Sequence, residues 1–311
     1  MAVEDARDDR SLIGPHGHDF SELRRELTKF DGERILFVPN YGNGGDALIN
    51  LGATQFLDRI GVRYERGTSR SDCRGRVVFY SGGGNLVQPY PNLKRFIERN
   101  ESQCAAFVIL PHTVRAYSST LAAMGQHSTI FAREQASFDF LNKHLGGARA
   151  LLSHDMAFML DQNGLRGMRR PIPESFTRRR LRRRLVRALR SARMAVERAR
   201  YGSGTLNAFR TDVEAPSGRP RPPGNNDLSR LFAVDDMSEW SCATTARHLA
   251  KAIAPYEKVR TDRLHIAILS ALIGKRVHML DNSYGKNRDI FEHSIRDYFD
   301  NVEFGEPADH R

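Results

Sequence analysis

The sequence predicts an α/β protein with two domains built on parallel sheets. Short apolar runs, such as residues 35–38, 76–80 and 105–110, alternate with longer segments of helical periodicity. Buried apolar strands that alternate with helices are typical of parallel sheets covered by helices on both faces. The chain has 311 residues, which is longer than most single domains. Two α/β domains are therefore expected.

The N-terminal half contains most of the predicted strands. Residues 1–33 are polar, with weak helical character from 20 to 30, and are expected to pack late or fray. The strand at 35–38 leads through a glycine-rich loop into a helix expected at 47–59, which is a βα unit. Further strands are expected at 76–80, 105–110, 128–134 and 150–152, and helices at 91–100 and 135–143.

Polar residues and glycines follow each of these strands. They are Asn43, Gly44 and Asp46, then Gly83, Gly84 and Asn85, then His112, Arg133, His154 and Asp155. Each one alone has an ordinary explanation as a turn, an ion pair or a filled space. Because ligands of doubly wound sheets bind beyond the carboxyl ends of the strands, their shared position predicts a binding site. The first glycine loop is neither a Walker loop nor a GxGxxG fingerprint, so a nicotinamide or ATP site is not expected.

The net charge of +11 comes almost entirely from one segment. Residues 178–200 contain eleven arginines and one glutamate, which gives +10 and leaves +1 for the rest of the chain. Apolar residues recur there every three or four positions, at Leu181, Leu185, Leu189, Ala192 and Val196. This pattern predicts a basic amphipathic helix within the segment 166–204, suited to an anionic membrane surface or a phosphorylated lipid carrier. The alternatives are a solvated charged helix or a disordered insertion. Nucleic acid is not expected as a partner, because the rest of the chain lacks a basic face.

The C-terminal half, residues 205–300, is expected to form the second α/β domain. Its predicted helices lie at 238–254, 266–273 and 288–299, its strands at 257–261 and from 277, and a polar tail at 301–311. Arg263 and His265 stand two residues apart where the second of these helices begins. A fixed cation and a group that titrates near neutral pH, both at a helix N-terminus, suit phosphate chemistry. The structural alternative is a surface salt bridge beside a core histidine.

Composition disfavours several other classes of protein. The three cysteines, Cys73, Cys104 and Cys242, are far apart, so neither a disulfide framework nor a zinc site is indicated. The N-terminus has no apolar signal region, and no stretch reaches the roughly 18 apolar residues that a membrane span needs. We expect a cytoplasmic protein, at most peripheral on the inner face of the membrane, with neither metal nor cofactor.

The motifs, taken in order, closely resemble those of the polysaccharide pyruvyl transferase family. The most specific are Gly42-Asn43-Gly44-Gly45-Asp46 and Arg263-Leu264-His265. The others are Gly82-Gly83-Gly84-Asn85, Leu110-Pro111-His112-Thr113, Ala132-Arg133-Glu134, Arg210-Thr211-Asp212 and Asn282-Ser283-Tyr284-Gly285-Lys286. The resemblance covers residues 34–160 and 205–300, and the arginine-rich segment departs from the family core.

The resemblance implies a fold and a reaction. The fold would be two Rossmann-like domains, at 34–165 and 205–300, facing across a cleft as in GT-B glycosyltransferases. The reaction would transfer the pyruvyl group of phosphoenolpyruvate, as donor substrate, to two hydroxyls of a sugar and form a cyclic ketal. Such transfers belong to the biosynthesis of exopolysaccharides or cell-surface glycans, and a lipid-linked or nucleotide-linked glycan would be the acceptor.

The resemblance also implies roles for individual residues. Arg263, Leu264 and His265 match the donor-binding and catalytic positions, and a second donor arginine would be Arg133 or Arg210. Loops lining the cleft would carry Asn43, Gly44, Asp46, Gly83, Gly84, Asn85, Tyr284 and Lys286. Independently of the resemblance, arginines bind both the phosphate and the carboxylate of phosphoenolpyruvate well. A histidine can donate the proton that C3 requires and accept one from a hydroxyl, so His265 is the first catalytic candidate and His112 the second.

Two rival functions fit the same residues. A GT-B glycosyltransferase could use Arg263 and His265 to hold the diphosphate of a nucleotide sugar, although no acidic residue is obviously placed for the ribose. A non-catalytic binder could use the arginine-rich helix for recruitment and the α/β core as a scaffold. Binding of phosphoenolpyruvate or of UDP separates the first rival from pyruvyl transfer.

Overall fold

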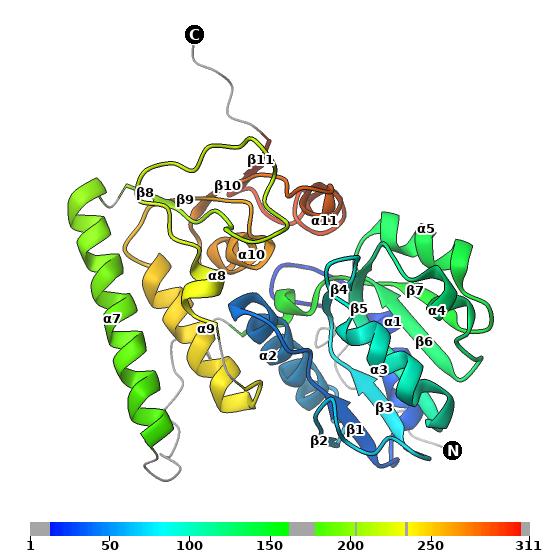
Figure 1. Cartoon of the computed structure of the whole chain (residues 1–311). Helices are drawn as coiled ribbons and strands as arrows, with labels where there is room; N and C mark the ends of the chain where they lie inside the picture. Colours follow the sequence, from blue (N-terminus) through cyan, green and yellow to red (C-terminus); the bar gives the residue numbers. More distant parts are fainter. Residues whose placement is uncertain (1–12, 162–177, 203, 234–235, 306–311) are drawn as a thin grey trace, which may run out of the picture. The chain divides into compact units, whose positions relative to one another are not determined.

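The chain divides into two compact units, each with parallel strands as in Rossmann-like folds (Figure 1). The computed structural model describes residues 13–161, 178–202, 204–233 and 236–305. Unit 1 comprises Met1–Asn40 and Gly52–Leu160, and unit 2 comprises Tyr41–Leu51 and Asp161–Arg311. The division falls inside helix α2 (Gly44–Arg59), so the glycine-rich loop and the first turns of this helix belong to unit 2.

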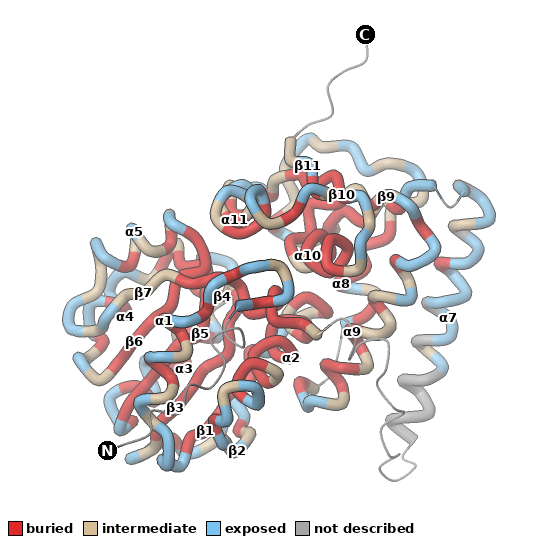
Figure 2. The backbone as a smooth tube through the Cα atoms, turned by 180° about the vertical axis from the view of Figure 1, so that it is seen from behind, coloured by how far each residue is buried: buried red, intermediate tan, exposed pale blue. Residues whose placement is uncertain are grey.

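Unit 1 is built on a seven-stranded parallel sheet of order β2-β1-β3-β5-β6-β7, with β4 paired to β5. The strands are β1 (Ile35–Val38), β2 (Tyr64–Arg66), β3 (Val77–Tyr80), β4 (Gly83–Leu86), β5 (Ala106–Val114), β6 (Ser128–Ala132) and β7 (Arg149–Leu152). Every residue of β1, β3, β5 and β6 is buried, as the red strands of Figure 2 show. Burial on both faces explains why these strands are mainly apolar in sequence.

Helices follow the strands of unit 1. They are α3 (Asn92–Asn100), α4 (Ser118–Ala122) and α5 (Gln135–His144), with short 3-10 turns at η3 (Glu101–Gln103) and η4 (Met156–Met159). Helix α3 packs on the sheet through Phe96, whose ring centroid lies 5.1 Å from that of Tyr80 and 6.0 Å from that of Phe107. The core of unit 1 is thus closed by aromatic contacts between a helix and the central strands.

The N-terminal segment is more ordered than its composition suggests. Helix α1 (Ser21–Leu27) and the 3-10 turn η2 (Thr28–Phe30) belong to unit 1, and Phe20, Leu23 and Leu27 are fully buried. Thr129 Oγ1 donates a hydrogen bond to Glu26 Oε1 over 3.2 Å, which ties the helix to β6. The expectation that this segment frays is therefore wrong for the part described, because three large apolar side chains anchor it.

Unit 2 is built on a four-stranded parallel sheet of order β11-β10-β9-β8. Its strands are β8 (Thr205–Asn207), β9 (Lys258–Thr261), β10 (Arg276–Met279) and β11 (Val302–Phe304). Its helices are α7 (Arg178–Tyr201), α8 (Leu228–Leu231), α9 (Glu239–Ile253), α10 (Leu264–Leu272) and α11 (Lys286–Ser294). The order β9, α10, β10, α11 repeats the βα unit that the sequence predicts for this half, and the unpredicted strand β11 extends it.

The structure differs from the expected ranges of domains and elements at three places. Residues Tyr41–Leu51 belong to unit 2 rather than to the first domain. The expected polar tail at 301–311 begins with strand β11, whose Val302 is buried, and residues 306–311 lie outside the described part. The second glycine loop contains strand β4, because residues 83 and 84 lack side chains and their backbone can pair beside β5.

Candidate active site

His265 is the exception in an otherwise buried helix. Every other residue of α10 is buried, whereas His265 is half-buried. It lies on the first turn of α10, immediately beyond the carboxyl end of β9, with Arg263 as the N-cap residue. This is the edge of a parallel sheet at which ligands bind.

The glycine-rich loop before α2 packs against His265. Asn43 Oδ1 accepts a hydrogen bond from Gly45 N over 2.8 Å, and Asp46 Oδ2 accepts one from Asn43 N over 2.7 Å. These two bonds form a variant of the capping box, with the Asn43 side chain on the second rather than the third helical amide, and they fix the start of α2. A Cβ atom at Gly45 would lie only 2.8 Å from His265 Nδ1, so the absence of a side chain at Gly45 lets the ring approach the helix start. The two most specific sequence motifs, 220 residues apart, therefore meet in one unit.

Two carboxylates hold Arg263 through its three side-chain nitrogen atoms. Its Nε and Nη2 donate to the two oxygens of Asp227 over 2.9 and 2.6 Å, and its Nη1 lies 2.7 Å from Asp212 Oδ2. The side chain is only 5% exposed. A guanidinium has five N–H donors, so these three contacts leave capacity for further acceptors. Asp227 also accepts from the backbone N and the hydroxyl of Thr211, each over 2.8 Å, which orients its carboxylate.

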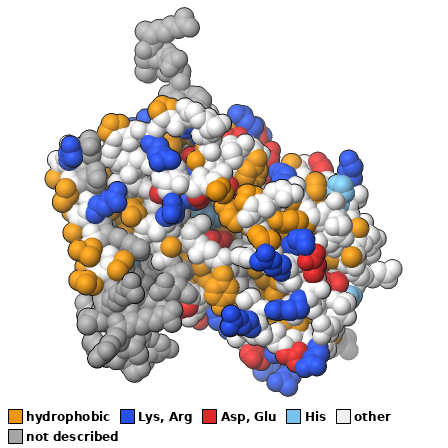
Figure 3. Space-filling view, in the orientation of Figure 1, with side chains coloured by type: hydrophobic (Ala, Val, Ile, Leu, Met, Phe, Trp, Pro, Cys, Tyr) orange, Lys and Arg blue, Asp and Glu red, His pale blue; other side chains and the backbone are white. Residues whose placement is uncertain are grey.

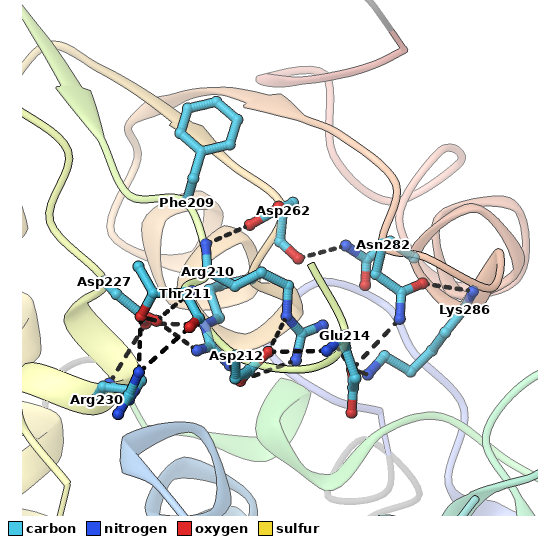
Figure 4. Close-up of polar contacts among 12 residues, drawn as sticks. Phe209, Arg210, Thr211, Asp212, Glu214, Asp227, Arg230, Asp262, Asn282 and Lys286 are labelled. Carbon is cyan, nitrogen blue, oxygen red and sulfur yellow. Dashed lines mark hydrogen bonds and ion pairs between the residues drawn. The ribbon is translucent and has the colours of Figure 1, made fainter. Parts of the chain in front are cut away.

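Arg210 joins the same network through Asp212 (Figure 4). Arg210 Nε donates to Asp212 Oδ1 over 2.8 Å, and its Nη1 lies 2.5 Å from Glu214 Oε2. Lys286 Nζ reaches the same oxygen of Glu214 over 2.9 Å. Asp212 thus bridges the two arginines, and Glu214 bridges Arg210 to Lys286. Three cations from three different segments of unit 2 are brought together in this way.

The charges of this network shift the pKa values of its members. Burial would raise the pKa of Glu214, but Lys286 and Arg210 lower it to about 2. Burial likewise opposes ionisation of Asp212, whose pKa is lowered to about 2 by Arg210 and Arg263. Burial raises the pKa of Asp262, whose Oδ1 accepts a 2.7 Å hydrogen bond from Arg210 N. At neutral pH, Asp212 and Glu214 are therefore ionised and hold the arginines in fixed orientations.

Tyr284 and Lys286 lie next to each other at the start of α11. Lys286 Nζ is 5.3 Å from the centroid of the Tyr284 ring, and Lys286 N donates to Asn282 Oδ1 over 3.0 Å. Within the described part of the chain, the buried hydroxyl of Tyr284 has no hydrogen-bond partner. Leu264, the remaining residue predicted for donor binding, is buried at the start of α10.

The other predicted residues form a separate network in unit 1. His112 is fully buried, and its Nε2 lies 3.2 Å from the backbone N and 2.7 Å from Oδ1 of Asn85. Asn85 Nδ2 donates to Asn40 Oδ1 over 2.7 Å. A Cβ atom at Gly83 would lie 2.2 Å from Asn40 Nδ2, so the bare backbone of β4 covers this network. Burial and the charge of Arg133 keep the pKa of His112 well below its usual range, which disfavours it as a proton donor.

Arg133 is also fixed inside unit 1. Its Nη1 donates to Asp155 Oδ2 over 2.6 Å and its Nε to Thr113 Oγ1 over 2.9 Å. Arg133 is 1% exposed and Asp155 is fully buried. A Cβ atom at Gly84 would lie 2.8 Å from Arg133 Nη2. Of the two candidates for a second donor arginine, Arg210 is therefore the one that shares a carboxylate with Arg263.

Sequence reasoning missed the carboxylates that position the arginines. Asp212 and Glu214 follow Arg210 by two and four residues, across a turn, and this short spacing was a local signal for ion pairs. Asp227 gave no such signal, because it lies 36 residues from Arg263 in the chain and at the N-cap of the short helix α8.

Known proteins are similar to this chain over most of its length. The sequence model of a family described as polysaccharide pyruvyl transferase matches residues 43–284. A protein of Bacillus subtilis (strain 168), named "Putative pyruvyl transferase EpsO", is 25% identical over 279 residues, which is 81% of this chain and 82% of that protein. The crystal structure of an uncharacterized protein from Klebsiella pneumoniae subsp. pneumoniae NTUH-K2044 has a TM-score of 0.69 at 24% identity. That similarity spans 91% of this chain and 97% of the other, and supports the fold.

Proposed function

Because this chain belongs to the polysaccharide pyruvyl transferase family, we propose that it transfers the pyruvyl group of phosphoenolpyruvate to two hydroxyls of one sugar, forming a cyclic ketal. The family places the protein in pyruvyl transfer during polysaccharide biosynthesis. The observation that carries the finer proposal is the pair Arg210 and Arg263, linked through Asp212 in the unit that also holds His265.

The paired arginines suit a donor with two anionic groups. Phosphoenolpyruvate has a phosphate and a carboxylate attached to the same carbon, C2, and planar guanidinium groups bind both geometries through two hydrogen bonds. Asp212, Asp227 and Glu214 keep the two guanidinium groups buried and oriented before the donor arrives. Such preorganisation reduces the entropy lost on binding. We therefore assign Arg263 and Arg210 to the donor, and Lys286 to charge balance beside them.

His265 is the proposed acid and base. Protonation of C3 of the enol phosphate generates an oxocarbenium-like C2, to which the first sugar hydroxyl adds after losing its proton. The C2–O bond to phosphate then breaks, and the second hydroxyl closes the ketal ring and gives its proton to the released phosphate. An imidazole can both donate and accept a proton, so one histidine can serve both transfers. His265 is half-buried at the sheet edge, whereas His112 is fully buried and engaged with Asn85.

The acceptor and the arrangement of the two units remain predictions. We propose a lipid-linked glycan precursor as the acceptor, consistent with synthesis of a polysaccharide by this family. We also propose a GT-B-like arrangement, in which both Rossmann-like units contribute to one site.

Calorimetric titration tests the donor assignment. We expect the wild type to bind phosphoenolpyruvate, and Arg263→Ala to weaken binding at least about tenfold because charge-assisted hydrogen bonds are lost. Arg230→Ala is the matched control, because Arg230 is exposed and contacts Thr211 at the edge of the network. Binding of UDP but not phosphoenolpyruvate by the wild type would instead support a nucleotide-sugar glycosyltransferase.

Replacement of Gly45 tests the contact between the two motifs. Gly45→Ala is expected to lower kcat about 100-fold, because a methyl group 2.8 Å from His265 Nδ1 must displace the ring. Gly204→Ala is the control, since a Cβ atom there would have no neighbour within 4 Å. Steady-state kinetics on phosphate release measures both variants. Equal rates for Gly45→Ala and Gly204→Ala would contradict a catalytic position for His265.

A further inference from the structure

Helix α7 carries an apolar stripe that faces solvent. Leu185, Leu189 and Val196 are 61%, 62% and 66% exposed, and Ala192 between them is exposed as well. The spacing of four, three and four residues keeps these side chains within roughly 60° around a helix of 3.6 residues per turn. Three of the six large hydrophobic residues exposed in the described part of the chain lie on this one helix. Leu181, also expected in the stripe, lies outside the described side chains.

The opposite side of α7 is the one that packs. Met194, nine residues after Leu185 and thus roughly half a turn away around the axis, is 6% exposed. Val186 and Arg198, on either side of Met194 around the helix, are half-buried. Figures 1 and 2 both draw α7 beside α9 of the same unit. The helix is therefore held by the Met194 side, and the leucine and valine stripe is directed away from the unit that carries it.

Positive charge accompanies the stripe. The eleven arginines and single glutamate of residues 178–200 account for +10 of the net charge of +11. Arg193 and Arg200 are exposed among the described side chains of α7. In Figure 3, hydrophobic and basic side chains lie next to each other at the edge where Figure 1 draws this helix. No helix of the described residues is both long and apolar enough to cross a bilayer.

We propose that α7 docks the protein on an anionic lipid surface. Leu185, Leu189 and Val196 would enter the boundary between head groups and acyl chains, while the arginines contact anionic head groups. A second copy of this chain is a poor occupant, because it would place +10 against +10. An acidic polymer would match the charge but would leave the exposed apolar stripe without a role. This docking does not depend on the identity of the donor substrate.

Vesicle co-sedimentation with the full-length protein tests the proposal. We expect binding to phosphatidylcholine vesicles with about a third phosphatidylglycerol, and at least about tenfold weaker binding to phosphatidylcholine alone. Raising the salt from about 0.1 to about 1 M should weaken binding at least about tenfold, because the Debye length falls from about 10 to about 3 Å. Equal binding to neutral vesicles at high salt would overturn the assignment.

Substitutions separate the stripe from the charge. The triple variant Leu185→Ser, Leu189→Ser, Val196→Ser is expected to lower vesicle binding at least about tenfold, because the inserted apolar area is lost. Val213→Ser is the control, since Val213 is 73% exposed in the same unit but outside α7. Thermal melts of the triple variant and the wild type should coincide. A large loss of melting temperature would show that the stripe packs inside the protein and would contradict the proposal.

A further comparison distinguishes a lipid surface from an acidic polymer as the ligand of α7. Binding of the triple variant to anionic vesicles as tightly as the wild type would mean that charge alone attracts the helix. Equal affinity of wild type and triple variant for a soluble polyanion such as polyglutamate, together with that result, would assign α7 to an acidic polymer and overturn lipid docking. Loss of vesicle binding with retained polyglutamate binding in the triple variant supports insertion of the stripe.

Discussion

Replacing His265 by glutamine is expected to lower kcat about 10²- to 10⁴-fold with a much smaller change in KM for phosphoenolpyruvate. Glutamine can keep a hydrogen bond in place but cannot carry a proton between the donor carbon and the sugar hydroxyls. The side chain stands at the edge of the parallel sheet of unit 2, against the helix start at Gly45. Steady-state rates of phosphate release, combined with calorimetric donor binding, provide both quantities.

A histidine elsewhere in unit 2 controls for general effects of the substitution. His248 is half-buried on α9 and stacks on Phe232 with ring centroids 6.1 Å apart. His248→Gln is expected to retain the wild-type kcat, because this contact is a packing contact. If His265→Gln retained more than about a tenth of kcat, the proton transfers would belong to another group, since general acid–base catalysis contributes at least about 10²-fold.

Replacing Arg133 by methionine is expected to destabilise unit 1 by about 3–5 kcal/mol. The substitution leaves Asp155, which is fully buried, without the guanidinium that lies 2.6 Å from its Oδ2. It also removes the 2.9 Å hydrogen bond from Arg133 Nε to Thr113 Oγ1. A buried carboxylate that loses its guanidinium partner is costly, because part of the compensation for its lost solvation is removed. Urea unfolding followed by far-ultraviolet circular dichroism measures the change.

A double variant distinguishes the pair from simple packing. Arg133→Met combined with Asp155→Leu is expected to recover a large part of the lost stability. In this double variant the buried carboxylate is removed together with its guanidinium partner. Full recovery is not expected, since Asp155 Oδ1 also accepts a 2.8 Å hydrogen bond from Ala157 N at the start of η4. A double variant less stable than Arg133→Met would show that packing around the arginine stem outweighs the ion pair.

Periodicity alone located most of the regular elements. Strand β1 was predicted with its observed bounds, and α5 and α9 were predicted within one residue at each end. These segments have strong apolar patterns and local boundaries, such as Ser238, whose side chain caps α9. Strands β2, β4 and β11 were missed, because they are three or four residues long and have no apolar pattern of their own.

The sequence pointed to several residues of the candidate site, but not to which of them lie together in space. Both residues of the central pair, Arg263 and His265, stood out from their chemistry at a helix start, and Arg210 was one of two open alternatives. The separation of Arg133 and His112 into another unit required the structure, as did the role of Asp227. Contacts of this kind join residues far apart in the chain, and no local spacing reports them.

By itself the sequence determined the α/β class, the family motifs and the confinement of the positive charge to residues 178–200, because these depend on local composition and periodicity. Only the tertiary structure decided that the glycine loop packs on His265, that Asp212 joins Arg210 to Arg263, and that the stripe of α7 faces outward. The physical reason is that burial and ion pairing are properties of surfaces brought together by folding, so a side chain's neighbours, and hence its chemistry, are set by the packed elements around it.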